Sequence, residues 1–411
     1  MPLPALRNVD VSPIEHDGEL MICLQDPEGL VETPVLLSPA AFAIATFLNG
    51  TNDVLDIQYQ LVTRTGRIVP AEDIRRIVNY LDEHGFLKSS QFEDLVDKVR
   101  REFQEAPVRP AHLAGRSYPE NAEDLRSFLD SFFVNENGPK VSPSQVTPRT
   151  LRLRGLIAPH IDFERGGPVY AHAYLNVARD GNVSRVLIFG VSHAPTSTPF
   201  VLTRKSFETP FGTLHNDVAV TDRLAQACHW DPFADELVHR SEHSIEFQAV
   251  FLGYLLGSQV KIVPVLCGGF PEDMSPSTEG IASEIRRFLD ACRELVNDPQ
   301  DQTWVIAGAD LAHVGKRFGD PIEIDDHVTE EVRARDFEDL GFVKQLDPEG
   351  WYASVMKDGN KRKVCGISAI YSLLKVMQGQ ATQANILSYD HAPDPFGGIV
   401  SFASVSFVGV E

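Results

Sequence analysis

Three apolar segments of the 411-residue chain each lead into a histidine or an aspartate. The segment LRLRGLIAPH ends on His160, and the segment VLIFGVSHAP reaches His193 after its apolar run. The segment TWVIAGADLAHVG places Asp310 after its apolar run, with His313 three residues later. Apolar runs of this length, bounded by glycine or proline, are typical of buried parallel strands. We therefore expect these side chains at one carboxyl edge of a sheet, where ligands commonly bind.

Imidazole and thiol groups together indicate metal chemistry. Neutral imidazole suits zinc, copper and iron, and a pocket with two or three protein ligands leaves coordination positions open. Cys365, in KRKVCGISAIYSLL, stands where a loop leads into a predicted helix. A helix N-terminus lowers the pKa of a thiol and favours the thiolate that binds metal. The alternative interpretation of Cys365 is a small buried apolar residue.

A second dense group of polar residues lies in HRSEHSIEFQAVFLGYLL, residues 239–256. Ser241 is predicted to cap a helix, with Glu242 and His243 in its first turn. Glu246 lies four residues after Glu242 and therefore on the same helix face. Such a group can orient ligand imidazoles from outside the metal. A capped helix start in a solvated loop is the alternative.

Charge and cysteine content exclude several classes of protein. The net charge of -21 and the pI near 5.0 argue against a nucleic-acid partner bound through its phosphates. The five cysteines are odd in number and form no CxxC pair, which favours reduced thiols in a cytoplasm. No stretch approaches the ~20 apolar residues of a membrane span, and the first residues lack the apolar core of a signal peptide. We expect a soluble cytoplasmic protein with no membrane partner.

The order of elements predicts three parts. Residues 1–90 contain two short predicted strands, 21–24 and 35–37, and three helical patterns, 40–48, 54–63 and 71–84, which suggest a small α+β winged-helix domain. Residues 91–107 form a charged linker helix. Residues 108–411 alternate strands with helices and predict an α/β domain with helices on both faces of its sheet. The first predicted helix of this domain covers 169–179, and a last pair of strands is predicted inside 398–410.

Most of residues 108–411 also resemble the Memo family, also called AmmeMemoRadiSam system protein B. The matching segments are HLAGRSYPENAEDLRSFLDSFF, GLIAPHIDFERGGPVYAHAY, LIFGVSHAP, ETPFGTLHND, SEHSIEFQ, KIVPVLCGG, GADLAHVG, VCGISAI and SFASVSF. The N-terminal pattern LSPAAFAIATFLNGTNDVLDI…IRRIVNYLDEHGFL resembles PqqD-like domains, which hold a leader peptide in peptide-modifying systems. A structural or dimerising appendage is the alternative for this first part.

The Memo resemblance implies a mixed α/β fold related to class III extradiol dioxygenases, which use non-haem iron. It implies that His160, His193 and Cys365 bind one metal ion, with Fe(II) as the expected ion and Cu as the alternative. His313 then stands at the acid/base position, with Asp310 beside it. Glu242 and His243 complete the expected catalytic set.

Three functions are consistent with these residues. The first is a metal-dependent redox enzyme of unknown substrate, associated with a radical SAM enzyme and a peptide or protein substrate. The second is a non-catalytic module that binds a peptide or protein in the same pocket. The third is a hydrolase using Ser192 or Ser241, which the absence of a GxSxG motif disfavours.

Overall fold

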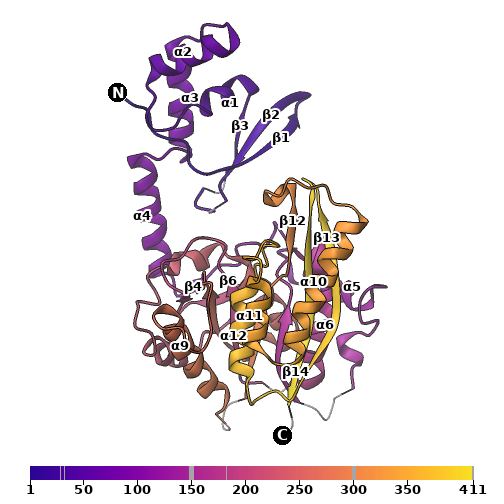
Figure 1. Ribbon diagram of the computed structural model, residues 1–411. Helices are drawn as coiled ribbons and strands as arrows, with labels where there is room; N and C mark the ends of the chain where they lie inside the picture. The colour runs from indigo at the N-terminus through magenta and orange to yellow at the C-terminus, as the bar shows by residue number, and fades with distance from the viewer. Residues whose placement is uncertain (28, 32, 148–151, 182, 299–301, 410–411) are drawn as a thin grey trace. The chain divides into compact units, whose positions relative to one another are not determined.

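The chain forms two compact units, Met1–Ala106 and Pro107–Glu411, and each is described by itself. Figure 1 labels their helices and strands. The computed structural model describes residues 1–27, 29–31, 33–147, 152–181, 183–298 and 302–409. Within these ranges, no helix combines the length and the apolar character needed to cross a bilayer.

The first unit contains a three-stranded antiparallel sheet in the order β1-β2-β3. Its elements are β1 (Asp10–His16), β2 (Glu19–Gln25), β3 (Val35–Leu37), α1 (Pro39–Ala45), α2 (Val54–Thr65), α3 (Ala71–Glu83) and α4 (Ser90–Glu105). The helices expected over 40–48, 54–63 and 71–84 are confirmed to within a few residues. Local capping explains α1, because the Ser38 side chain accepts the N–H of Ala41 at its start.

Strand β1 is missing from the sequence prediction. Its residues are largely exposed and include Pro13, so they carry no regular apolar alternation. The turn that follows was the feature of the sequence that could have indicated this strand. Asp17 and Gly18 have φ angles of 52° and 77°, the left-handed pair that a two-residue hairpin turn requires.

The second unit is built on a larger mixed sheet. Its elements are β4 (Val108–Arg109), α5 (Ala122–Val134), η1 (Pro143–Gln145), β5 (Arg152–Ala158), α6 (Phe163–Asp180), β6 (Arg185–Val191), β7 (Phe200–Leu202), β8 (Ser206–Thr209), β9 (Gly212–Leu214), α7 (Val218–Ala225), η2 (Glu236–Arg240), α8 (His243–Leu256), η3 (Gly257–Gln259), β10 (Lys261–Cys267), α9 (Ile281–Val296), β11 (Thr303–Gly308), β12 (His313–Gly315), η4 (Lys316–Phe318), α10 (Asp326–Lys344), α11 (Pro348–Met356), α12 (Ile367–Met377), β13 (Gln383–Asp394) and β14 (Gly398–Gly409).

The central sheet has eight strands in the order β12-β14-β5-β11-β6-β10-β7, with β13 paired to β14. Strands β5, β11, β6 and β10 run parallel, whereas β7 and β14 pair antiparallel with their neighbours. A smaller sheet has the order β4-β8-β9. The predicted mixed α/β architecture, with a central sheet flanked by helices, is confirmed.

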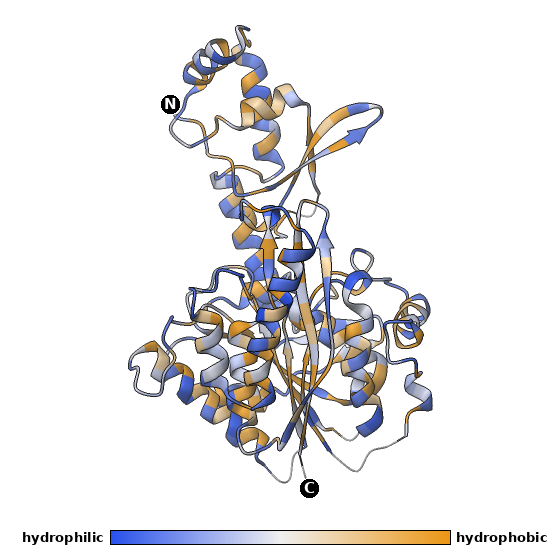
Figure 2. Ribbon diagram, turned by 45° about the vertical axis from the view of Figure 1, so that its right-hand side comes forward, coloured by the Kyte–Doolittle hydropathy of each residue, from blue (hydrophilic) through white to orange (hydrophobic). Residues whose placement is uncertain are grey.

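Both faces of the central sheet are buried. Along β6, Leu187 and Phe189 pack in one hydrophobic core, while Val186 and Ile188 pack in the other. Figure 2 shows hydrophobic residues gathered on the central strands of this unit. A strand covered on both sides needs apolar residues at every position, which explains the continuous apolar runs in the sequence.

The main departures from the predicted elements concern helix starts and the last hairpin. Helix α6 begins at Phe163, although a start at Val169 was expected, because Asp162 caps it and the helix contains Pro168 in its interior. Helices α5 and α11 were not predicted. A last pair of strands was expected inside 398–410, but β14 is one continuous strand that pairs with the long β13. Val410 lies outside the described residues.

Candidate metal centre

The three strand exits meet at one edge of the central sheet. In the register of β11, Gly308 lies beside Ala158 of β5, and Ala307 lies beside Phe189 of β6. The residues that follow these strands are therefore brought together. His160 Nε2 lies 3.6 Å from Asp310 Oδ2.

Three imidazoles form the centre of this edge, and we call His160, His193 and His243 the histidine cluster. One ligand atom from each residue lies within 4.8 Å of the others. The ring centroids are 5.0 Å apart for His160 and His193, 5.2 Å for His160 and His243, and 4.7 Å for His193 and His243. His160 is buried, His243 is half-buried and His193 is exposed.

Hydrogen bonds from the outer ring nitrogens set the tautomers. His160 Nδ1 lies 3.0 Å from the carbonyl oxygen of Gly308, and His193 Nδ1 lies 3.1 Å from both carboxylate oxygens of Glu242. These oxygens accept hydrogen bonds, so we assign the proton of each ring to Nδ1. In the neutral rings Nε2 then carries the lone pair, which is the ligand form of histidine, and Nε2 of His160 lies beside the Cys365 thiol.

Glu242 connects two of the three histidines. It is the N-cap of α8, and its Oε1 accepts the N–H of Ser244 at 3.0 Å. Its Oε2 accepts the backbone N–H of His193 at 2.9 Å, and Oε1 lies 3.3 Å from His243 Nδ1. Burial alone would raise the pKa of Glu242, but the neighbouring charges of His243 and His193 hold that pKa well below its usual range. The carboxylate is thus kept ionised.

The electrostatics differ among the three imidazoles. Burial, with the charges of His193 and His243, lowers the pKa of His160 well below its ordinary value. Burial also lowers the pKa of His243. Burial opposes protonation of His193 too, but Glu242 more than offsets it and raises the pKa of His193. His160 and His243 therefore favour the neutral form that binds metal.

Cys365 and Asp310 line the same pocket beside His160. Cys365 Sγ lies 3.3 Å from His160 Nε2, and Asp310 Oδ1 accepts the backbone N–H of His160 at 2.9 Å. The expected lowering of the thiol pKa at a helix start is wrong, because burial and the Asp310 charge raise the pKa of Cys365 well above its usual range. Burial likewise raises the pKa of Asp310 to about 7. Both groups favour their protonated forms when no cation is present.

His313 lies near this centre without joining the histidine cluster. It starts β12, its backbone N–H donates to the Arg362 carbonyl at 2.7 Å, and its ring packs edge-on against Phe318. Burial lowers the pKa of His313 to about 4, and the charge of His193 contributes in the same direction. All seven candidate residues of the sequence are therefore near one another. His243, which was expected in the catalytic set, joins His160 and His193 in the group of side chains that could hold a metal ion. Its place directly after the Glu242 cap was the available signal.

Comparison with known proteins gives a family match over most of the chain. The family model described as "Memo-like protein" matches residues 109–407. The chain belongs to the Memo family. The matched range contains the histidine cluster, Cys365, Asp310 and His313.

Curated relatives in the Memo family extend over different shares of the chain. A MEMO1 family protein of Aquifex aeolicus is 27% identical over 406 residues, covering 98% of this chain and 99% of the relative. A MEMO1 family protein of Thermus thermophilus is 26% identical, covering 79% and 89%. One of Desulfurococcus amylolyticus is 27% identical, covering 72% and 97%. The Aquifex match is long enough to include most of the first unit as well as the Memo-like second unit.

Proposed function

We propose that this Memo family member binds one transition-metal ion in the second unit, with His160, His193 and His243 as nitrogen donors and Cys365 as a further donor. The convergence of three ligand atoms within 4.8 Å carries this proposal. The donor set fits the group, because imidazole and thiolate suit iron and copper. Fe(II) is the proposed ion and Cu the alternative. A redox-active ion bound there would supply electron-transfer chemistry to a bound substrate.

The surrounding residues would orient the donors and handle protons. Glu242 holds His193, and the Gly308 carbonyl holds His160, so both rings keep Nε2 directed away from these partners. Such outer contacts fix the tautomer and raise the basicity of metal ligands. Asp310 and His313 are the proposed groups that hold or move a proton at the edge of the pocket. A redox activity, a relationship to class III extradiol dioxygenases and a radical SAM partner stay predictions based on resemblance.

Metal analysis tests the proposal directly. The purified protein would be reconstituted anaerobically with Fe(II) or Cu(I), desalted, and its bound metal measured by mass spectrometry. We expect about one ion per chain, and loss of that ion in His160→Ala. His172→Ala is the matched control, because that imidazole on α6 bonds the Asn137 carbonyl outside the cluster. Near-zero metal in the unmodified protein, equal to His160→Ala, would overturn the proposal.

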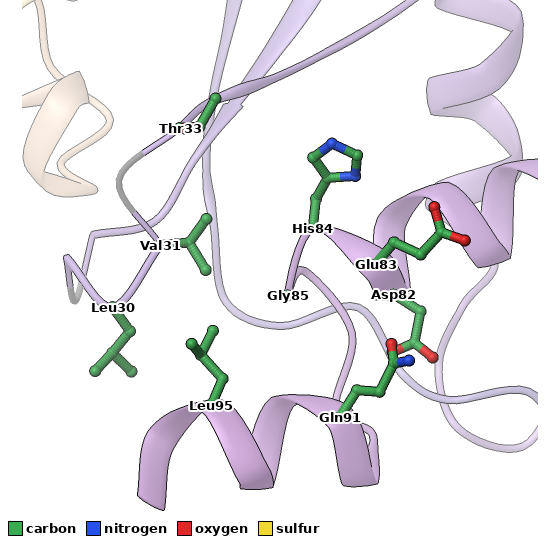
Figure 3. A pocket seen from close by; sticks show the side chains of 9 residues that line it. All are labelled: Leu30, Val31, Thr33, Asp82, Glu83, His84, Gly85, Gln91 and Leu95. Atoms are coloured by element: carbon green, nitrogen blue, oxygen red, sulfur yellow. The ribbon is translucent and has the colours of Figure 1, made fainter. Parts of the chain in front are cut away.

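A second candidate function, binding of a polypeptide segment, is favoured by a cavity in the first unit. The cavity measures about 560 Å³, within the ~300–1,000 Å³ of typical ligand pockets. Figure 3 shows Leu30, Val31 and Leu95 around one part of it, and Glu83 and His84 in another. Asp82 also lines it, and the described residues that line it include no lysine or arginine. An aliphatic side chain next to a basic one would suit these walls.

Asp26 and Arg7 hold residues of the cavity wall in place. Asp26 accepts the N–H of Val31 at 2.8 Å and pairs with Arg7 at 2.9 Å. Arg7 also donates to the carbonyl of Gly85 at 2.9 Å and lies over the Phe92 ring. Side chains fixed in this way lower the entropy cost of binding.

A peptide titration tests whether this cavity binds a polypeptide segment. Labelled peptides that carry Leu-Lys or Leu-Glu would be titrated against the full chain by fluorescence anisotropy. We expect preference for the Leu-Lys peptide and its loss in Glu83→Lys, with the exposed Glu93→Lys on α4 as the control. Equal affinity for both peptides would contradict the candidate.

A further inference from the structure

A fully buried ion pair lies in the second unit beside the residues that carry the histidine cluster. Arg109 of β4 approaches Glu246 of α8, with NH1 2.6 Å from Oε2, and both side chains are 0% exposed. The Arg109 guanidinium also lies over the ring of Phe207, 5.0 Å from its centroid. Removing two charges from water is expensive, so a buried pair is weak evidence of a stabilising role. Its other contacts indicate what it does.

The remaining Arg109 donors bond the backbone that leads into α8. Nε donates to the carbonyl of His239 at 2.7 Å, and NH2 donates to the carbonyl of Glu242 at 3.0 Å. One rigid guanidinium thus bonds two carbonyls within the short segment before His243. Because arginine is planar, these bonds fix the position and the direction of that segment together.

Glu246 fixes the other side of the same turn. Its Oε1 accepts the Tyr118 hydroxyl at 2.5 Å and the backbone N–H of Leu113 at 2.9 Å. His243 lies three residues before Glu246 and therefore one turn away on α8. The first turn of α8 is consequently held by Arg109 at its start and by Leu113 and Tyr118 through Glu246.

We propose that Arg109 and Glu246 form a positioning pair for the histidine cluster. The backbone carbonyl of Glu242 is bonded by Arg109, while its carboxylate bonds His193 and lies beside His243. A shift of this residue would move two of the three imidazoles at once. The pair therefore sets the geometry of the metal donors without contacting the metal, and this inference rests on the proposed metal-binding function.

Conservative variants of Arg109 and Glu246 test the pair without removing any proposed metal donor. Glu246→Gln keeps the size of the side chain and an acceptor for Tyr118 and Leu113 but removes the negative charge. Arg109→Lys keeps the positive charge but cannot bond both carbonyls in the same plane. Contacts behind metal ligands typically contribute 10–100-fold to affinity, and we expect losses of about that size in chelator competition with Co(II) or Fe(II). The visible spectrum of the Co(II) form should change as well.

A metal-free readout keeps this inference separate from the proposed function. In the unmodified protein, at a pH high enough to keep His193 neutral, ¹⁵N shifts of the histidine rings should show its proton on Nδ1, and Glu246→Gln should broaden or alter that signal. Glu349→Gln is the matched control, because it removes the 2.9 Å pair with Lys375 elsewhere in the same unit. Circular dichroism would verify that each variant is folded.

The outcomes are decisive in both directions. If both variants lower the melting temperature but keep the metal affinity and the His193 tautomer of the unmodified protein, the pair is only structural and the inference is wrong. If the unmodified protein binds no metal, the proposed function fails. In that case a changed His193 signal still supports the positioning pair, and an unchanged signal overturns it.

Discussion

Two clusters of polar side chains in the second unit differ in how their polar atoms are partnered. The first, which we call the ionic cluster, contains one arginine and two aspartates with their hydroxyl partners: Arg362, Asp336, Asp339, Ser354, Tyr389 and Ser401. The second is the histidine cluster. Both lie in the same unit; both aspartates of the ionic cluster are buried, whereas the histidine cluster joins buried His160 to half-buried His243 and exposed His193. They differ in whether the polar atoms face partners or face one another.

In the ionic cluster, all four carboxylate oxygens meet a donor. Arg362 bonds Asp336 and Asp339 through its two terminal nitrogens. The second oxygen of Asp336 accepts Tyr389 at 3.0 Å and also Ser401, and the second oxygen of Asp339 accepts Ser354 at 2.5 Å. These carboxylates are satisfied within the protein itself, while Nε of Arg362 is buried without a hydrogen-bond partner among the described residues.

In the histidine cluster, the inner nitrogens are acceptors directed toward a shared space. Their outer nitrogens are satisfied by Gly308 and Glu242. Lone pairs that face one another gain nothing until a cation is placed between them. The ionic cluster is thus paired within the fold, whereas the histidine cluster surrounds the space in which the proposed metal ion would bind.

The largest loss in the free energy of unfolding should come from breaking the ionic cluster. Arg362→Met leaves two buried carboxylates without their cation, and removing one partner of a buried pair typically costs about 3–5 kcal/mol. Urea unfolding followed by fluorescence would measure it. A loss no larger than that of Lys375→Met, which breaks the pair with Glu349, would contradict the comparison.

The free energy of unfolding should depend on pH through Asp336, and a neutral variant of this residue should lack that dependence. Burial raises the pKa of Asp336 to about 6, above the ordinary 3.8. The folded state therefore favours its protonated form, and its contribution to stability is complete below pH 3.8 and is lost as the pH rises through about 6. At 1.36 kcal/mol per unit, this amounts to about 3 kcal/mol. Unfolding of Asp336→Asn and the unmodified protein across pH 4–7 would measure it. A difference in stability that stays constant with pH would rule the effect out.

Metal should stabilise the fold only through the histidine cluster. A ligand at 100 times its Kd contributes about 2.7 kcal/mol to the free energy of unfolding. We expect Fe(II), added anaerobically, to raise the melting temperature of the unmodified protein and of Tyr389→Phe, but not that of His193→Ala. Without metal, His193→Ala should unfold close to the unmodified protein. Equal metal protection in His193→Ala would show that the ion binds elsewhere.

The smallest effect should come from one hydroxyl of the ionic cluster. Tyr389→Phe removes a single hydrogen bond to a carboxylate, a change of about 1.5 kcal/mol. Losing this donor should also move the Asp336 titration to higher pH, because the bond favours the charged form. Unfolding at pH 5 and pH 7 would measure both effects, and a shift to lower pH would contradict the assigned contact.

The sequence indicated the edge of the sheet better than the roles of the residues on it. Continuous apolar runs identify covered parallel strands, and the ends of such strands share an edge, so the meeting of His160, His193 and Asp310 was predictable. The place of His243 depends on how α8 packs, which spacing along the chain does not contain. The Cys365 pKa was misjudged because burial outweighs the helix start.

The Arg109–Glu246 pair was beyond prediction from the sequence. The two residues are far apart in the chain, and only the pairing of β4 with β8 places Arg109 beside α8. An arginine at the very start of a predicted domain, directly after a charged linker helix, is ordinarily expected to be exposed. Its complete burial is a property of the folded second unit alone.

The position of Arg109 also decides where the chain can be divided. The two units separate between Ala106 and Pro107, and the Pro107 carbonyl already accepts the N–H of Ser206. A fragment of the second unit that begins beyond Arg109 would keep all three histidines, yet Glu246 would remain as a buried anion without its cation. Any separation of the units by protease or by gene truncation must therefore leave residues 107–110 attached to the second unit.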